Sequence, residues 1–585
     1  MYNFLHNNIF VNKKILIIMS PFFVILLLSL APIIYKFFII KNYNDLLFID
    51  GSSAESVQFY LSKSYSLIHN LSFFFKEYSA DKTVYFSADL IPNIILAFFI
   101  LFAKQYATLF LNIIFIFATY SLLYYFLKKK FSLIQSLLFV IVIICFHGIG
   151  PHAVVQIYKF IFLKDPVNIG HISRYYSPSF IEIFLLIYLF FLNKAYQKNS
   201  YYGLYIFTII NFFSYFFYSL IVIVCNGLLT IILFKKKYFV KKLIFLNFLS
   251  IVYLYFCYLI YSKLQFNLNT QGFNLDFENI NLYNFLKLRD FQVSIFLLFL
   301  IFFLKFKKLL IKNSNIDFKK IILIYLVTSV LYIVDFFVNI QISDHISRYF
   351  VRTFNWFVVL FIFFKLSFFY KLKIKTIKTW SIRYKDIVYI FIIFYLLACY
   401  QVNTYLFYKK NNEIYAQDYI NQTNIINDLK EINIFIKNNS LKKNVFIDDA
   451  YTNVIASSVL QSLNGEDYSL YNPSIFRSYS LNLHNSLILF TDQCFFFNLT
   501  RFECYEDFET YSNNQFLNNS FLFYGNRNFK FKDFEDIYDL NIDRIKKLDD
   551  TIFIISKSNS NYLKKLYKLE KNNNMIYLNN LVFAY

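Results

Sequence analysis

The stretch KILIIMSPFFVILLLSLAPIIYKFFII, residues 14–40, is apolar along nearly its whole length. A helix needs roughly 20 apolar residues to cross the hydrocarbon core of a bilayer. The stretch is longer than the apolar core of a signal peptide, and it lacks a cleavage site of small residues. It therefore predicts a helix that stays in the protein and spans a membrane.

Composition extends this conclusion to most of the chain. The 585 residues are 58% hydrophobic and 23% aromatic, and the mean hydropathy is +0.46, far outside the range of a soluble domain. Apolar runs of spanning length recur as far as residue 407, which predicts a mostly α, polytopic protein. We expect eleven spans, near residues 14–40, 106–127, 131–149, 179–193, 201–216, 218–234, 238–262, 290–305, 320–340, 351–370 and 386–407.

One further apolar segment, LIPNIILAFFILF at 90–102, is shorter than a full span. A helix of this length covers only part of the bilayer thickness. We expect it either to lie in the membrane interface or to re-enter the membrane.

The net charge of +22 comes mostly from lysines in the short loops between apolar runs. Lysine-rich loops stay in the cytoplasm, so the pattern sets the orientation of an inner-membrane protein and does not indicate nucleic-acid binding. The N-terminus is then cytoplasmic. The segments expected outside the cytoplasm are 41–89, 150–178, 263–289, 341–350 and 408–585.

The tail from 408 to 585 differs from the membrane domain, 1–407, because it is rich in Asn, Asp, Lys and Tyr. Short apolar runs bounded by polar residues predict buried strands, and the run YTNVIASSVLQSL predicts a helix. The strands are expected at 444–449, 486–492 and 551–556. This alternation predicts a small extracytoplasmic α/β domain with some parallel pairing.

Cys494 and Cys504 in the tail flank the sequence FFFNLTRFE. They lie on the side of the membrane that we expect to be oxidising, so they are candidates for a disulfide. No glycine-rich phosphate loop follows the first predicted strand, and nothing in the tail indicates a nucleotide site.

The pentapeptide HISRY occurs twice, at 171–175 and at 345–349, each time just before an apolar run. Arginine binds phosphate in two-point fashion, and helix N-termini add exposed amide donors. We expect His171, Arg174, His345 and Arg348 to hold a phosphate at the outer membrane boundary. The alternative is that they only anchor helix ends in the interface.

Arg352 joins this group because it lies four residues after Arg348 and shares its helical face. Asn355 lies one turn further along the same face. The three side chains are expected to face one site together.

The first outward segment supplies candidate proton acceptors, Asp50 and Glu55, directly after the first span. A carboxylate held near apolar walls can have a raised pKa and act as a general base toward a hydroxyl. Asp50 is the first choice and Glu55 the second. The alternative is that both are ordinary solvated acids.

Other ionisable residues give weaker indications. His147 and His152, with His171 and His345, lie near the predicted outer face, but no metal-ligand spacing accompanies them, and we predict no metal or other cofactor. Asp335 falls inside a predicted span, where an acid is either functional or paired with an arginine.

The layout of the chain resembles the C-type (GT-C) membrane glycosyltransferases, which include protein mannosyltransferases and aminoarabinose transferases. A first helix, a long outward loop that opens with acids, about eleven spans and an outward C-terminal domain are shared features. The segment SADLIPNIILAFFILFAKQYATLFLNIIFIFATYSLLYYFLKKKFS, residues 87–132, is similar to the part of that superfamily between the first loop and the second full span.

The resemblance implies an enzyme that uses a polyprenyl-phosphate-linked sugar. It assigns the catalytic base to an acid of the first loop, here Asp50 or Glu55, and donor phosphate binding to basic residues at the outer ends of later spans, here Arg174, Arg348 and Arg352. This sequence has no adjacent Asp-Glu or Asp-x-Asp pair in its first loop.

We therefore expect a glycosyltransferase that moves a sugar from a polyprenyl-phosphate donor to a hydroxyl of a lipid, glycan or protein outside the cytoplasm. Two alternatives stay open from the sequence. One is a transporter or flippase of a lipid-linked anion, and the other is an O-antigen polymerase or ligase. A transporter needs polar residues that continue through the spans, whereas the charges here gather at the outer end.

Overall fold

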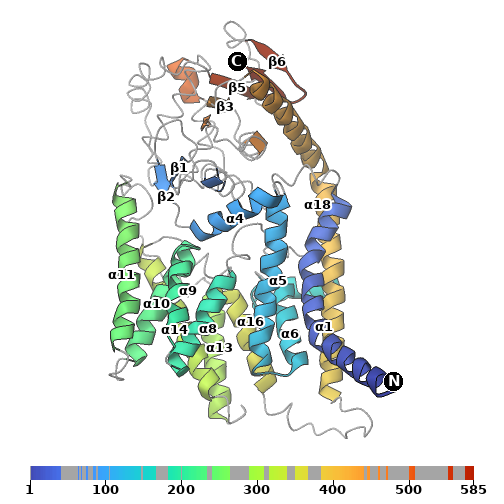
Figure 1. Ribbon diagram of the computed structural model, residues 1–585, viewed down its shortest axis with the longest axis vertical. Helices are drawn as coiled ribbons and strands as arrows, with labels where there is room; N and C mark the ends of the chain where they lie inside the picture. Colours follow the sequence, from blue (N-terminus) through green and yellow to red (C-terminus); the bar gives the residue numbers. More distant parts are fainter. Residues whose placement is uncertain are drawn as a thin grey trace.

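The computed structural model is mostly helical, with a few strands (Figure 1). It describes residues 2–40, 64, 67–68, 74–76, 84–86, 90–103, 106–146, 149–166, 182–198, 200–233, 240–263, 289–307, 315–338, 350–365, 384–439, 444–447, 459–460, 469–471, 500–506, 551–557 and 574–585.

Each predicted span contains one helix of the structure. The helices are α1 (Tyr2–Ile39), α4 (Leu90–Ala103), α5 (Ala107–Lys128), α6 (Leu133–Cys145), α7 (Val154–Phe162), α8 (Glu182–Lys198), α9 (Tyr202–Phe212), α10 (Phe216–Leu233), α11 (Val240–Lys263), α13 (Arg289–Phe306), α14 (Asn315–Val338), α16 (Arg352–Lys365) and α18 (Tyr384–Asn438).

Three of the described helices are long and apolar enough to cross a membrane, which indicates membrane association. They are Met19–Ile39 within α1, the whole of α5, and Asp386–Asn438 of α18. Several others are apolar but short: α6 has 13 residues, which at 1.5 Å per residue covers about 20 Å, less than the thickness of the hydrocarbon core.

Aromatic contacts show the relative directions of α6, α16 and α18. Phe131, just before α6, packs on Phe364 near the end of α16, and Phe146, just after α6, stacks on Trp356 near the start of α16. These two helices are therefore antiparallel. Tyr389, near the start of α18, also packs on Phe364, so α18 runs in the same direction as α6.

Helix α1 lies beside α18 along the bundle (Figure 1). The Tyr400 hydroxyl donates to the carbonyl of Leu28 over 3.4 Å, and the rings of Tyr35 and Tyr405 meet edge to face. We call the end of the bundle from which α18 leaves toward the strands the sheet end. Helices α13 and α16 both begin toward this end.

Helix α4 runs across the sheet end of the bundle, whereas α5 runs along it (Figure 1). Its Ile91 amide donates to the carbonyl of Phe213, and its Asn93 carbonyl accepts from the hydroxyl of Ser64. The segment predicted as either interfacial or re-entrant is thus a helix laid over the others. Strands β1 (Phe74–Lys76) and β2 (Val84–Phe86) form an antiparallel pair at the same end.

Helix α7 was not predicted, because the sequence analysis treated 150–178 as a loop. Its Phe160 is fully buried, whereas Val154, Val155, Tyr158 and Phe162 are exposed. It contacts α18, where Tyr395 donates to the carbonyl of Ile161. A short helix with apolar residues on both faces fits between the bundle and lipid.

Beyond the bundle, α18 packs on a five-stranded sheet of order β4-β3-β5-β7-β6. The strands are β3 (Asn444–Ile447), β4 (Ser469–Tyr471), β5 (Thr551–Ser556), β6 (Met575–Tyr577) and β7 (Leu581–Ala584). Strand β3 pairs in parallel with β4 and β5, and β7 is antiparallel to β5 and β6. Strands lie at two of the predicted positions, 444–447 and 551–556, and the parallel pairs give the sheet some parallel pairing, as predicted. The strand predicted at 486–492 lies outside the described residues.

The helix and the sheet share an apolar core that includes Ile426, Leu429, Ile447, Ile554 and Phe583, all fully buried. The predicted boundary at 407 falls inside α18, which runs without a break from the bundle into this core. The two parts of the molecule are therefore joined by one continuous helix.

Candidate functional site

Most of the predicted site residues lie outside the described residues. These are Asp50, Glu55, His171, Arg174, His345 and Arg348, together with His147, Cys494 and the side chain of Asp335. Arg352 and His152 are described, and the structure brings both to one carboxylate, that of Asp290.

Arg352, the first residue of α16, forms an ion pair with Asp290 of α13. Its Nε donates to Asp290 Oδ2 over 3.0 Å. The Asp290 side chain is only 7% exposed and the Arg352 side chain 24%. Because a buried carboxylate without a cation is costly, this pair ties the starts of the two helices together.

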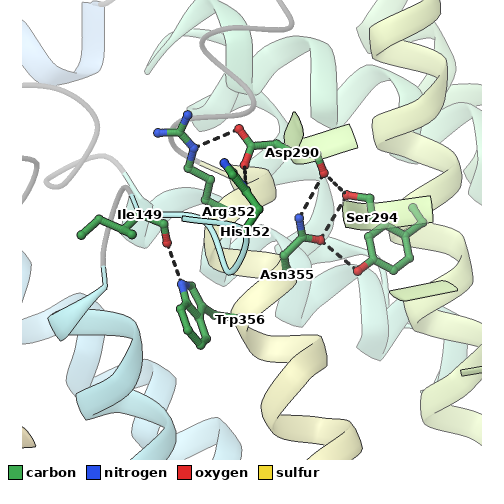
Figure 2. Close-up of polar contacts among 8 residues, drawn as sticks. Ile149, His152, Asp290, Ser294, Arg352, Asn355 and Trp356 are labelled. Carbon is green, nitrogen blue, oxygen red and sulfur yellow. Dashed lines mark hydrogen bonds and ion pairs between the residues drawn. The ribbon is translucent and has the colours of Figure 1, made fainter. Parts of the chain in front are cut away.

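Asp290 is also held through its backbone by a buried network of neutral groups. The Asn355 amide donates to the carbonyl of Asp290 over 3.3 Å, and the Ser294 hydroxyl donates to the same carbonyl over 2.9 Å. The Asn355 side-chain oxygen accepts from the Tyr325 hydroxyl over 2.9 Å and also lies 3.1 Å from the Ser294 oxygen, whose single proton points to the nearer Asp290 carbonyl. As predicted, Arg352 and Asn355 share a helical face, and both contact Asp290 (Figure 2).

His152 approaches Asp290 from the turn that joins α6 to α7. Its Nδ1 lies 3.3 Å from Asp290 Oδ1, although neither atom makes a hydrogen bond. A proton on Nδ1 would give both atoms a partner. The Trp356 indole donates to the carbonyl of Ile149 over 2.6 Å and fixes this turn on α16 (Figure 2).

Gly150 allows the close approach of this turn. A Cβ atom at that position would overlap the ring of His152 and come within 2.7 Å of Asp290 Oδ1. Gly150 therefore leaves the space in which the His152 ring lies beside Asp290.

The pKa of His152 is lowered from its ordinary value of 6.5. Burial of the ring is the main cause; the Asp290 carboxylate opposes it, and the charges of Arg352 and Arg289 add to it. The ring is accordingly neutral at pH 7. The arrangement combines two arginines, an imidazole that can gain a proton and a single buried carboxylate, which is chemistry suited to binding an anion.

Sequence reasoning missed Asp290. The signal was present: an Arg-Asp pair opens the apolar run at 289–306, and a buried acid at a helix start calls for a cation from elsewhere. His152 was weighed only as a metal ligand, and the described residues hold no group of three or more metal-ligating side chains.

No protein-family model, curated protein or solved structure matches this chain.

Proposed function

We propose that this chain is a membrane glycosyltransferase of the inner membrane, with about eleven spans and an extracytoplasmic α/β domain. It would move a sugar from a polyprenyl-phosphate donor to a hydroxyl of a lipid, glycan or protein. The observation that carries the proposal is the Arg352–Asp290 pair at the sheet end of the bundle.

Arg352 suits the role of donor phosphate ligand because its guanidinium is fixed. Asp290 holds the Nε edge, and the terminal nitrogens point away from the carboxylate (Figure 2). A fixed guanidinium stabilises the charge that develops on the leaving phosphate without reorganising first. Arg174, Arg348, His171 and His345 are proposed to join it.

The general base is proposed to be Asp50 or Glu55, which would take the proton of the acceptor hydroxyl. Two described parts of the first outward segment, Ser64 and the β1–β2 pair, lie at the sheet end. Arg352 and the C-terminal sheet lie toward the same end. This common location supports an active face there.

A disulfide supports an extracytoplasmic location of the tail. Cys504 is buried and disulfide-bonded, and disulfides persist in oxidising compartments. Labelling of engineered cysteines in 41–89 and in the tail by a membrane-impermeant maleimide tests the topology. A tail that is labelled only after the membrane is opened would rule out this active face.

Activity is tested in membrane vesicles with polyprenyl-phosphate-linked pentoses and hexoses that carry tritium in the sugar. The wild type should transfer label to an acceptor and release polyprenyl phosphate. Arg352→Lys should raise the donor KM roughly 10- to 100-fold, since one charge-assisted contact of about 1.5–3 kcal/mol loses its geometry. Asp50→Asn or Glu55→Gln should lower kcat by about 100-fold or more.

Lys159→Gln is the matched control, because Lys159 pairs with Asp165 on the surface, away from Asp290. This variant should leave the donor KM and kcat unchanged. If the labelled lipid crosses the vesicle membrane intact and no polyprenyl phosphate is released, the protein is a flippase and the transferase proposal is wrong.

A further inference from the structure

Two arginines lie near the contact between His152 and Asp290. Arg352 contacts Asp290 directly, and Arg289, which is exposed at the start of α13, lies close enough to act on His152. Asp290 contacts both His152 and Arg352. A proton on His152 would therefore add a positive charge beside Arg352.

The His152–Asp290 contact is also incomplete. Oδ1 of the buried Asp290 and Nδ1 of His152 each lack a hydrogen bond, although they lie 3.3 Å apart. The His152 side chain is 20% exposed. Because its Nδ1 atom is buried, this exposure belongs to the other atoms of the side chain. The ring can thus bond to Asp290 on one edge and face a ligand on the other.

We propose that the Arg352 site binds the phosphate of a lipid-linked donor together with one proton, which His152 takes up. This inference rests on the proposed function and specifies its donor site. The added proton completes the Nδ1–Oδ1 hydrogen bond and gives the phosphate a second cation beside Arg352. Binding of the anion and binding of the proton then favour each other.

The expected direction follows from the charges that face His152. Burial and the two arginines of α13 and α16 lower its pKa, and Asp290 of α13 raises it. The free site therefore carries a neutral ring at pH 7 and a charged ring in acid. Donor affinity should rise as the pH falls below the ordinary imidazole range and level off at alkaline pH.

A farnesyl-phosphate-linked hexose is the probe for this linkage. It is a phosphodiester, so its charge stays constant between about pH 5 and pH 8, unlike that of a phosphate monoester, whose second pKa is near 6. Binding to the full-length protein in detergent is measured by calorimetry, in two buffers of different ionisation enthalpy. The wild type should take up a proton on binding and bind roughly tenfold more tightly at pH 5 than at pH 8.

Three variants sharpen the test. His152→Gln should bind as the wild type does at pH 8 and lose the dependence on pH. Arg289→Gln removes a charge that lowers the pKa of His152, so the rise in affinity should move to higher pH. Lys159→Gln should behave as the wild type. Thermal unfolding of each variant in the same detergent checks that it is folded.

The outcomes separate this inference from the proposed function. A wild type that binds and transfers the donor without proton uptake, or a His152→Gln variant that keeps the full dependence on pH, would overturn the inference alone. A wild type that neither binds the probe nor transfers sugar would overturn the proposed function, and the inference with it. The calorimetric proton count needs no variant.

Discussion

The bundle and its junction with the sheet each contain a buried aspartate, and the two are satisfied in different ways. Asp290 is 5% exposed and faces Arg352 and His152. Asp428 of α18 is 1% exposed and accepts only backbone amides, from Asn580 at 2.6 Å and Leu581 at 3.1 Å. Asp290 has one partner whose charge changes with pH, His152, whereas the amides that bind Asp428 stay neutral.

This difference separates an electrostatic role from a structural one. The amides on Asp428 close the turn between β6 and β7 onto α18, and their number and charge are the same at any pH. The partners of Asp290 come from three separate segments and include a histidine whose pKa is shifted. We therefore expect changes around Asp290 to alter ligand binding and changes at Asp428 to alter local stability.

The largest effect is expected from Arg352→Leu. It leaves the buried Asp290 carboxylate without its arginine, and removal of one partner of a buried pair costs about 3 kcal/mol or more. Thermal unfolding in detergent should show the loss. The double variant Arg352→Leu with Asp290→Asn should recover part of it, because the buried charge is gone. A double variant no more stable than the single one would show that the pair is not a charge pair.

Asp428→Ala should have a smaller, local effect. It removes the one carboxylate oxygen that accepts from both the Asn580 and the Leu581 amides, at about 2 kcal/mol, and hydrogen exchange should increase at the turn between β6 and β7. Asp428→Asn keeps an oxygen acceptor and should lose about half as much. Donor affinity should be unchanged in both. A dependence of donor affinity on Asp428 would remove the contrast between the two aspartates.

Gly150→Ala should cost least in stability, about 1 kcal/mol, because the added methyl group meets the His152 ring, a side chain that can shift, and not the backbone of the turn. That shift moves His152 away from Asp290, since the added Cβ would overlap the imidazole ring. The dependence of donor binding on pH should weaken while Arg352 remains in place. Ala153→Gly, in the same turn, serves as the control and should leave the dependence intact.

The sequence predicted the helices well because apolar runs of spanning length have few other solutions. Each predicted span contains a helix, and strands lie at 444–447 and 551–556, inside two of the predicted strand positions. Helix α7 was missed because nine residues between polar stretches give too short a periodic signal. Strands β6 and β7 were missed because they pair antiparallel through a short turn that carries no glycine.

The site was only partly predictable for a different reason. Arg352 and Asn355 were placed together because their spacing is local to one helix. Asp290 lies 62 residues before Arg352 and His152 lies 138 residues before Asp290, so their meeting depends on packing between α6, α13 and α16. Spacing within one sequence carries no information about such contacts.

Helix α18 has a mechanical consequence. Between Tyr408, which packs in the helix–sheet core, and Thr423, none of its residues is buried. These fourteen residues, 409–422, are exposed or half-buried and make about 20 Å of helix. The number of residues in this segment therefore sets the distance between the sheet and the bundle and the rotation of the sheet about the helix axis. Each inserted residue would lengthen the helix by about 1.5 Å and rotate the sheet by about 100°.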